Sequence, residues 1–135
     1  MEFFLHPTLE KETIFVARTE ALQIRLVDDG RYFWFIIIPE TAATELHELD
    51  EDIAASLWAM ARHLGGALKT HCDAIKINTA AIGNMVPQLH VHIVARHDDD
   101  DAWPQPIWGR GEMQSLNEET RAARLSIIQS WLGRM

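Results

Sequence analysis

Apolar and polar residues alternate near the start of the chain, as is typical of β-strands. Residues 13–18 are rich in β-branched and aromatic side chains, and apolar residues at 22, 24 and 26 alternate with Gln23 and Arg25. A period of two places Gln23 and Arg25 together on one solvent-exposed face of a sheet. These two segments are therefore expected to form a β-hairpin, which ends in a turn at residues 28–30.

The next apolar segment, residues 32–38, is too continuous for a strand with one exposed face. Such a run is typical of a central strand covered on both sides, and the proline that follows it ends the strand. Two shorter strands are expected at residues 74–78 and 89–95. The loop between them, residues 79–87, contains Gly83 near its centre.

Apolar residues at spacings of three and four predict two helices. The first begins at Asp50 as N-cap, and Gly65-Gly66 is expected to end or bend it. The second begins near Asn117. Together with the strands, these helices predict a single α+β domain over residues 1–135. The core positions expected on the helices are Ile53, Leu57, Met60, Leu64 and Leu68 in the first, and Leu125, Ile128 and Leu132 in the second.

Composition narrows the classes of partner. The chain has 135 residues and a formal net charge of −8, which repels phosphate backbones and anionic lipid, so neither a nucleic-acid partner nor a membrane partner is expected. The longest unbroken apolar run, residues 32–39, is far shorter than the roughly 18 residues of a membrane helix. Cys72 is the only cysteine, so no intrachain disulfide forms and a cytoplasmic location is expected.

Two of the seven histidines, His90 and His92, lie one residue apart in the 89–95 segment. Alternation on a strand places both on the same face as Gln88 and Val94. Neighbouring side chains on that face are rooted roughly 6.6 to 7 Å apart, so two imidazoles can act on one substrate. Histidine serves as a neutral nucleophile or as an acid near neutral pH.

Spacing alone leaves three interpretations of this pair: catalysis, metal binding, or a polar edge with no role. A zinc site needs three or four ligands, and no cysteine or carboxylate has a suitable spacing here. The acidic run at residues 98–101 is expected to be a solvated loop rather than a calcium site, because consecutive side chains cannot all point at one ion.

The run from Val86 to Val94 resembles the signature of the histidine triad (HIT) family, His-φ-His-φ-His-φ-φ, where φ is apolar. A glycine loop precedes the run and Arg96 follows it. In this register Gln88 takes the first histidine position and His90 the middle one. The Ile-Pro strand end, the long helix and the strand containing Asn78 also follow in the family's order. The resemblance implies a HIT-like fold, an antiparallel sheet of about five strands with a long central helix and a C-terminal helix.

The resemblance also implies an activity. Such proteins are nucleotide hydrolases or nucleotidyl transferases that act on the α-phosphate of dinucleoside polyphosphates or nucleoside phosphoramidates. His90 matches the nucleophile that forms a nucleotidyl-histidine intermediate. His92 would contact the transferred phosphate or pass a proton to the leaving group, and Gln88 would hydrogen-bond without titrating. No metal and no other cofactor is expected, the partner is a small nucleotide substrate, and a homodimer is expected.

Substrate-binding candidates follow from the same match. Asn78 resembles the family asparagine near the phosphates, and Asp28 is the candidate ribose ligand. The glycine loop contributes three further candidates, which are Gly83, Asn84 and Met85.

Several positions depart from the family pattern. Gln88 replaces the first histidine, Asn84 stands where glutamine is frequent, and Met85 replaces a serine or threonine that donates to phosphate. The alternative function is therefore a nucleotide-binding or regulatory protein with slow or lost hydrolysis. Among the other aromatic residues, Trp103 and Trp108 are placed to cover a nucleotide, whereas Trp58 and Trp131 suit packing or a subunit contact. Surface or capping roles are expected for His6, His47, His63 and His71.

Overall fold

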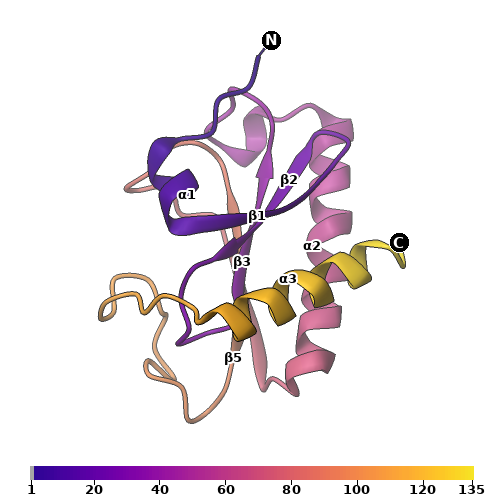
Figure 1. Ribbon diagram of the computed structural model, residues 1–135. Helices are drawn as coiled ribbons and strands as arrows, with labels where there is room; N and C mark the ends of the chain where they lie inside the picture. The colour runs from indigo at the N-terminus through magenta and orange to yellow at the C-terminus, as the bar shows by residue number, and fades with distance from the viewer. Residues whose placement is uncertain (1) are drawn as a thin grey trace.

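The structure is a computed structural model that describes residues 2–135. Its centre is a single antiparallel sheet in which the strands lie in the order β1-β2-β3-β5-β4 (Figure 1). The strands are β1 (Thr13–Thr19), β2 (Leu22–Val27), β3 (Trp34–Pro39), β4 (Lys76–Ala80) and β5 (Val91–Arg96). The helices are α1 (Pro7–Glu12), α2 (Glu51–Cys72), α3 (Glu118–Leu132) and the 3-10 turn η1 (Leu46–Glu48). The predicted α+β class, with its long central helix and C-terminal helix, is confirmed.

The predicted hairpin forms between β1 and β2, but the predicted exposed face is wrong. Gln23 and Arg25 are both buried, with 3% and 8% of their surface exposed. Arg25 Nε donates to Thr13 Oγ1 at 2.7 Å, and Arg25 Nη1 donates to Gln23 Oε1 at 2.8 Å. These side chains satisfy one another beneath the N-terminal segment. Period-two alternation reports which positions are polar, but it cannot show that another segment of the chain covers the polar face.

Strand β3 lies at the centre of the sheet, between β2 and β5, and all of its residues are buried. This confirms a strand covered on both faces. Strands β4 and β5 begin two residues later than expected, at Lys76 and Val91. Helix α1 was not predicted, because its six residues are too few to show a helical period.

Helix α2 begins after Asp50 and continues through Gly65-Gly66 to Cys72, so the predicted break is wrong. Gly65 is buried against the sheet, where an added Cβ would lie 3.8 Å from Ile77 Cγ2. The packing of the flanking leucines on the sheet outweighs the weak helix propensity of the two glycines. The helix ends at Asp73, whose φ of 50° is left-handed.

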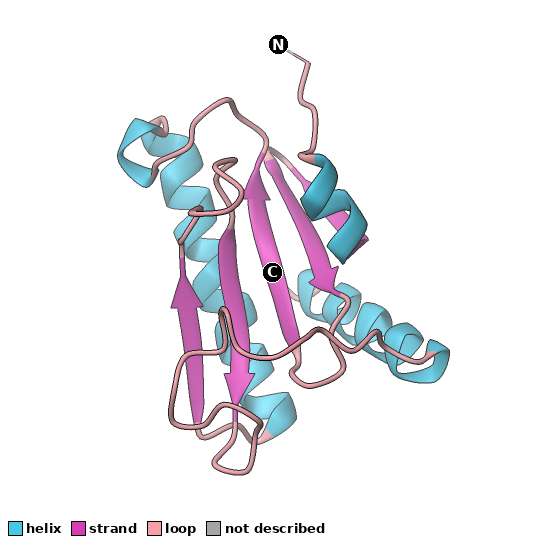
Figure 2. Ribbon diagram, turned by 90° about the vertical axis from the view of Figure 1, so that its left-hand side faces the viewer, coloured by secondary structure: helices cyan, strands magenta, loops and turns pink. Residues whose placement is uncertain are grey.

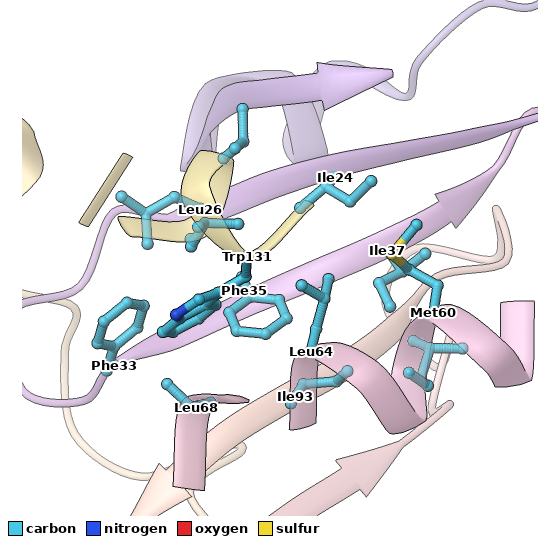
Figure 3. Packing of buried hydrophobic residues seen from close by; sticks show 14 of the residues in the cluster. Ile24, Leu26, Phe33, Phe35, Ile37, Met60, Leu64, Leu68, Ile93 and Trp131 are labelled. Carbon is cyan, nitrogen blue, oxygen red and sulfur yellow. The ribbon is translucent and has the colours of Figure 1, made fainter. Parts of the chain in front are cut away.

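The sheet has a buried layer on each side. Helices α2 and α3 cover one face, and their side chains interdigitate with those of the strands (Figure 3). We call this cluster the helix-side core. Its members are Val16, Leu22, Ile24, Leu26, Phe33, Phe35, Ile37, Leu57, Met60, Ala61, Leu64, Leu68, Ala74, Val91, Ile93, Ala95, Ile128 and Trp131.

The opposite face, which points toward the viewer in Figure 2, is covered by α1 and by long loops. We call its cluster the histidine-side core, because His92 contacts it. Its members are Leu9, Val27, Tyr32, Trp34, Ile36, Ile38, Val86, Val94, Ala102 and Ile107. Among residues 2–135, none of the helices is both long and apolar enough to cross a membrane.

Candidate active site

His90 and His92 lie together at the start of β5. Their rings are 4.8 Å apart between centroids and meet edge to face at 71°. His92 is paired across the sheet with Ile36 of β3 and Ala80 of β4, so its backbone is held on both sides. His90 and His92 are only 6% and 8% exposed. The predicted placement of two imidazoles on one face is therefore observed.

The protonation of His92 is fixed by its neighbours. Trp34 Nε1 can only donate, and it lies 3.0 Å from His92 Nδ1, so Nδ1 is unprotonated and the ring proton is on Nε2. Burial, together with the nearby His90, lowers the pKa of His92 to about 3. His92 is therefore neutral at pH 7. It offers an N–H donor, and this favours a contact with phosphate over transfer of a proton from a charged ring.

His90 has the opposite tautomer. Its Nδ1 lies 2.7 Å from the backbone carbonyl of Gln88, which can only accept, so Nδ1 carries the proton. The lone pair is therefore on Nε2. Burial lowers the pKa of His90, an effect that the bond to Gln88 opposes and nearby His6 reinforces. A neutral imidazole with an oriented Nε2 lone pair is a nucleophile at neutral pH without further activation.

A hollow of about 250 Å³ opens beside His90. It lies between the segment before α2 and the glycine loop, and Gly83 lines it with a left-handed φ of 69°. That conformation favours glycine at this position of the loop. Asn84 and Met85 do not line this hollow, and Met85 is 93% exposed. His47 is exposed, as expected, and it also lines this hollow.

Asn78 lines a second hollow of about 400 Å³, together with Trp108. Asn78 Oδ1 accepts a hydrogen bond from Arg96 Nη1 at 2.8 Å, which leaves its NH₂ group to donate elsewhere. Trp108 also lies beside His92, with ring centroids 5.3 Å apart. Trp103, in contrast, packs against the Arg96 guanidinium at 5.5 Å. Asn78 lies on the edge strand β4, where it pairs with Val94 of β5, the strand that follows His90.

Arg96 anchors the loop that carries these tryptophans. It is 1% exposed and forms a two-bond ion pair with Asp100, at 2.8 and 3.0 Å, and also donates to the Gln105 carbonyl. Burial alone would raise the pKa of Asp100, but hydrogen bonds from Arg96 and from backbone amides hold it at about 2. The acidic run at residues 98–101 is thus only partly solvated, because the side chain of Asp100 is buried in its ion pair with Arg96.

The side chains of two predicted site residues, Asp28 and Gln88, are bonded to other segments of the chain. Asp28 follows the far end of β2, and its Oδ1 accepts from the backbone N–H of Leu116 at 2.9 Å. Gln88 directs its side chain toward the N-terminal segment, where it bonds the backbone of Phe4 and His6. Sequence reasoning missed Trp34 and Asp100, because neither has a partner at a regular spacing along the chain.

A metal ion bound by His90 and His92 would need at least one further protein ligand. Within residues 2–135, no three His, Cys, Asp or Glu side chains come together in a metal-binding arrangement. The pair also differs from an exposed polar edge, because both rings are buried and each has a fixed hydrogen bond.

Comparisons with known proteins match this chain in sequence and in fold. The HIT domain family model matches residues 8–99. A crystal structure of a histidine triad protein from Sinorhizobium meliloti is 36% identical, with a TM-score of 0.91 over 95% of this chain and 96% of that one. One from Marinobacter aquaeolei is 31% identical, with a TM-score of 0.94 over 98% and 97%.

A more distant structure shares the fold alone. The hypothetical histidine triad nucleotide-binding protein of Sulfolobus tokodaii is 20% identical, with a TM-score of 0.67 over 91% of this chain and 85% of that one. Comparison with curated proteins found no matching relative.

Proposed function

The chain belongs to the HIT domain family, and we propose on this premise that it is a nucleotide hydrolase or nucleotidyl transferase that works through His90. The substrates are dinucleoside polyphosphates or nucleoside phosphoramidates, attacked at the α-phosphorus. The observation that carries this proposal is the orientation of His90, whose Nδ1–H is bonded to the Gln88 carbonyl so that Nε2 is free to attack.

In the first step, the Nε2 lone pair of His90 forms a bond to the α-phosphorus. The bond from phosphorus to the leaving oxygen or nitrogen breaks, and the leaving group takes that electron pair and is protonated from solvent. The neutral Nε2–H of His92 donates to a phosphate oxygen, and backbone N–H groups of the glycine loop around Gly83 stabilise the developing charge. The product is a nucleotidyl-histidine.

In the second step, water attacks the same phosphorus and loses a proton to solvent. The bond between phosphorus and Nε2 breaks, and the electron pair returns to the imidazole of His90. Hydrolysis releases a nucleoside monophosphate, whereas attack by another acceptor completes a transfer. Dividing one displacement into two easier ones is the advantage of covalent catalysis.

The free NH₂ group of Asn78 fits a role as donor to the phosphate or ribose. Trp108 is placed to pack against a base or leaving group in the second hollow. Asp28 does not fit the role of ribose ligand, because it follows β2 at the end of the sheet opposite to His90.

The test is mass spectrometry of the protein after brief incubation with diadenosine polyphosphate or adenosine phosphoramidate. The wild-type protein should gain the mass of one nucleoside monophosphate, and His90→Ala should not. His71→Ala is the matched control, because His71 belongs to the opposite layer and should leave the adduct intact. If the wild-type protein shows neither adduct nor turnover with both classes of substrate, the enzymatic proposal is wrong.

A nucleotide-binding protein without turnover is the second candidate. The exposed Met85 favours it, since no hydroxyl is present there to donate to a leaving group. Calorimetric binding of a nucleoside monophosphate with no adduct would support this candidate. A homodimer and a cytoplasmic location remain predictions, and light scattering of the purified protein tests the first.

A further inference from the structure

The side-chain amide of Gln88 makes two hydrogen bonds to the N-terminal segment. Its Oε1 accepts from the backbone N–H of His6 at 2.8 Å, and its Nε2 donates to the backbone carbonyl of Phe4 at 2.8 Å. The two bonded groups belong to alternate residues, so the amide binds this segment as a neighbouring strand would. We call residues 3–6 the N-terminal strap.

The strap lies on the same side of the sheet as the histidines. Phe3 and Leu5 pack against the histidine-side core, and the following helix α1 buries Leu9 in it. Figure 2 shows α1 on the face opposite α2. Gln88 thus fastens a segment whose side chains pack against the histidine-side core.

Gln88 connects the imidazole of His90 to the backbone of His6. Its backbone carbonyl accepts from His90 Nδ1, and its side-chain oxygen accepts from the backbone of His6. His6 Nδ1 in turn accepts from the Thr8 N–H at 3.1 Å and caps α1, so its ring proton is on Nε2. The backbone of His6 and the ring of His90 are thus both bonded to Gln88, at 2.8 and 2.7 Å, and the pKa of His90 is lowered by His6 as well as by burial.

We propose that Gln88 is a positioning residue that fastens the N-terminal strap, and that His6 supplies a third imidazole whose Nε2–H donates to a phosphate oxygen of the substrate. This inference rests on the proposed function. The chain then still presents three imidazoles around the phosphate, although one of them comes from a different segment. An amide suits position 88 because its donor and acceptor point in nearly the same direction, whereas the two ring nitrogens of a histidine diverge.

Calorimetry with adenosine monophosphate and with adenosine separates the phosphate contact from the rest of binding. His6→Asn keeps an acceptor that caps α1 but removes the Nε2–H donor. Its affinity for adenosine monophosphate should fall roughly tenfold, as expected for one hydrogen bond to a charged group, while its affinity for adenosine is unchanged.

Gln88→Met tests the two hydrogen bonds between the Gln88 side chain and the N-terminal strap. It should weaken binding of adenosine monophosphate to a similar degree, and the double variant His6→Asn/Gln88→Met should be no weaker than either single variant, since both act through the same contact. Hydrogen exchange at the His6 amide should become faster in Gln88→Met. Gln114→Glu and His71→Asn, both outside the site, are the controls and should bind like the wild-type protein.

The outcomes separate this inference from the proposed function. If the wild-type protein binds adenosine monophosphate and forms the His90 adduct, but His6→Asn retains full affinity, the role of His6 is wrong and the proposed function stands. If the effects of the two single variants add, Gln88 does not act through His6. If the wild-type protein binds no nucleotide at all, both proposals fail.

Discussion

The helix-side core is packed with apolar side chains from two regular helices, whereas the opposite face buries His92 and Arg96 beneath a short helix and loops. On the helix side, burial itself supplies the stabilisation. On the histidine side, the buried polar groups of His92 and Arg96 are each held by a specific partner, Trp34 for His92 and Asp100 for Arg96. The comparison shows that this fold separates the layer that stabilises the sheet from the layer that holds the chemistry.

Breaking the buried ion pair between Arg96 and Asp100 should have the largest effect on stability. Arg96→Met leaves Asp100 buried without its counter-charge, and we expect a loss of about 3–5 kcal/mol in the free energy of unfolding. Urea denaturation measures it. Arg18→Met is the matched control, because Arg18 forms an ion pair with Glu40 but has a side chain that is 54% exposed, so about 1 kcal/mol or less is expected. Equal losses in the two variants would contradict the anchor role of Arg96.

Removing volume from the helix side should cost nearly as much stability without affecting the site. Leu64 is fully buried in the helix-side core, and Leu64→Ala should lower the free energy of unfolding by about 3 kcal/mol. At a temperature where the variant is still folded, its affinity for adenosine monophosphate should equal that of the wild-type protein. A marked loss of affinity would show that the two layers are coupled.

Acid should destabilise the protein through the histidine side. The folded-state pKa of His92, about 3, lies below the ordinary value of 6.5, so the unfolded chain binds a proton that the folded protein does not. Stability should therefore fall as the pH decreases from 6.5 toward 3, by roughly 1.4 kcal/mol per pH unit. The lowered pKa of His90 acts in the same direction.

His92→Asn tests this origin, since its side-chain oxygen can still accept from Trp34 but does not titrate. Urea midpoints at pH 7 and pH 5 should differ less in this variant than in the wild-type protein. An unchanged pH dependence would assign the acid sensitivity to other groups.

The smallest expected effect is a gain on the helix side. Gly66 is exposed on α2, and an added Cβ would meet nothing within 4 Å. Gly66→Ala should therefore raise the free energy of unfolding by about 0.5–1 kcal/mol through helix propensity. Thermal unfolding checks it, and a decrease would mean that α2 needs the flexibility of this glycine.

Regular periodicity allowed much of the fold to be predicted. The apolar stripe around Leu64 located α2, and the continuous run ending at Pro39 located the central strand. The expectation that α2 ends or bends at Gly65-Gly66 fails as to the end, because helix propensity is a weak local effect and packing against the sheet overrides it. The expectation that Gln23 and Arg25 lie on an exposed face is also wrong, because a local pattern does not show which segment covers that face.

At the candidate site, the sequence by itself determined the pair of histidines on one strand face, the glycine loop beside them, and the order of elements that the HIT family shares. Only the tertiary structure decided which nitrogen of His90 and of His92 carries the proton, that Asn78 is held by Arg96, and that Gln88 binds the strap that contains His6. The physical reason is that periodicity fixes the direction of a side chain relative to its own strand. The partner of a buried polar group comes from segments distant in the sequence, and it exists only once the chain has folded.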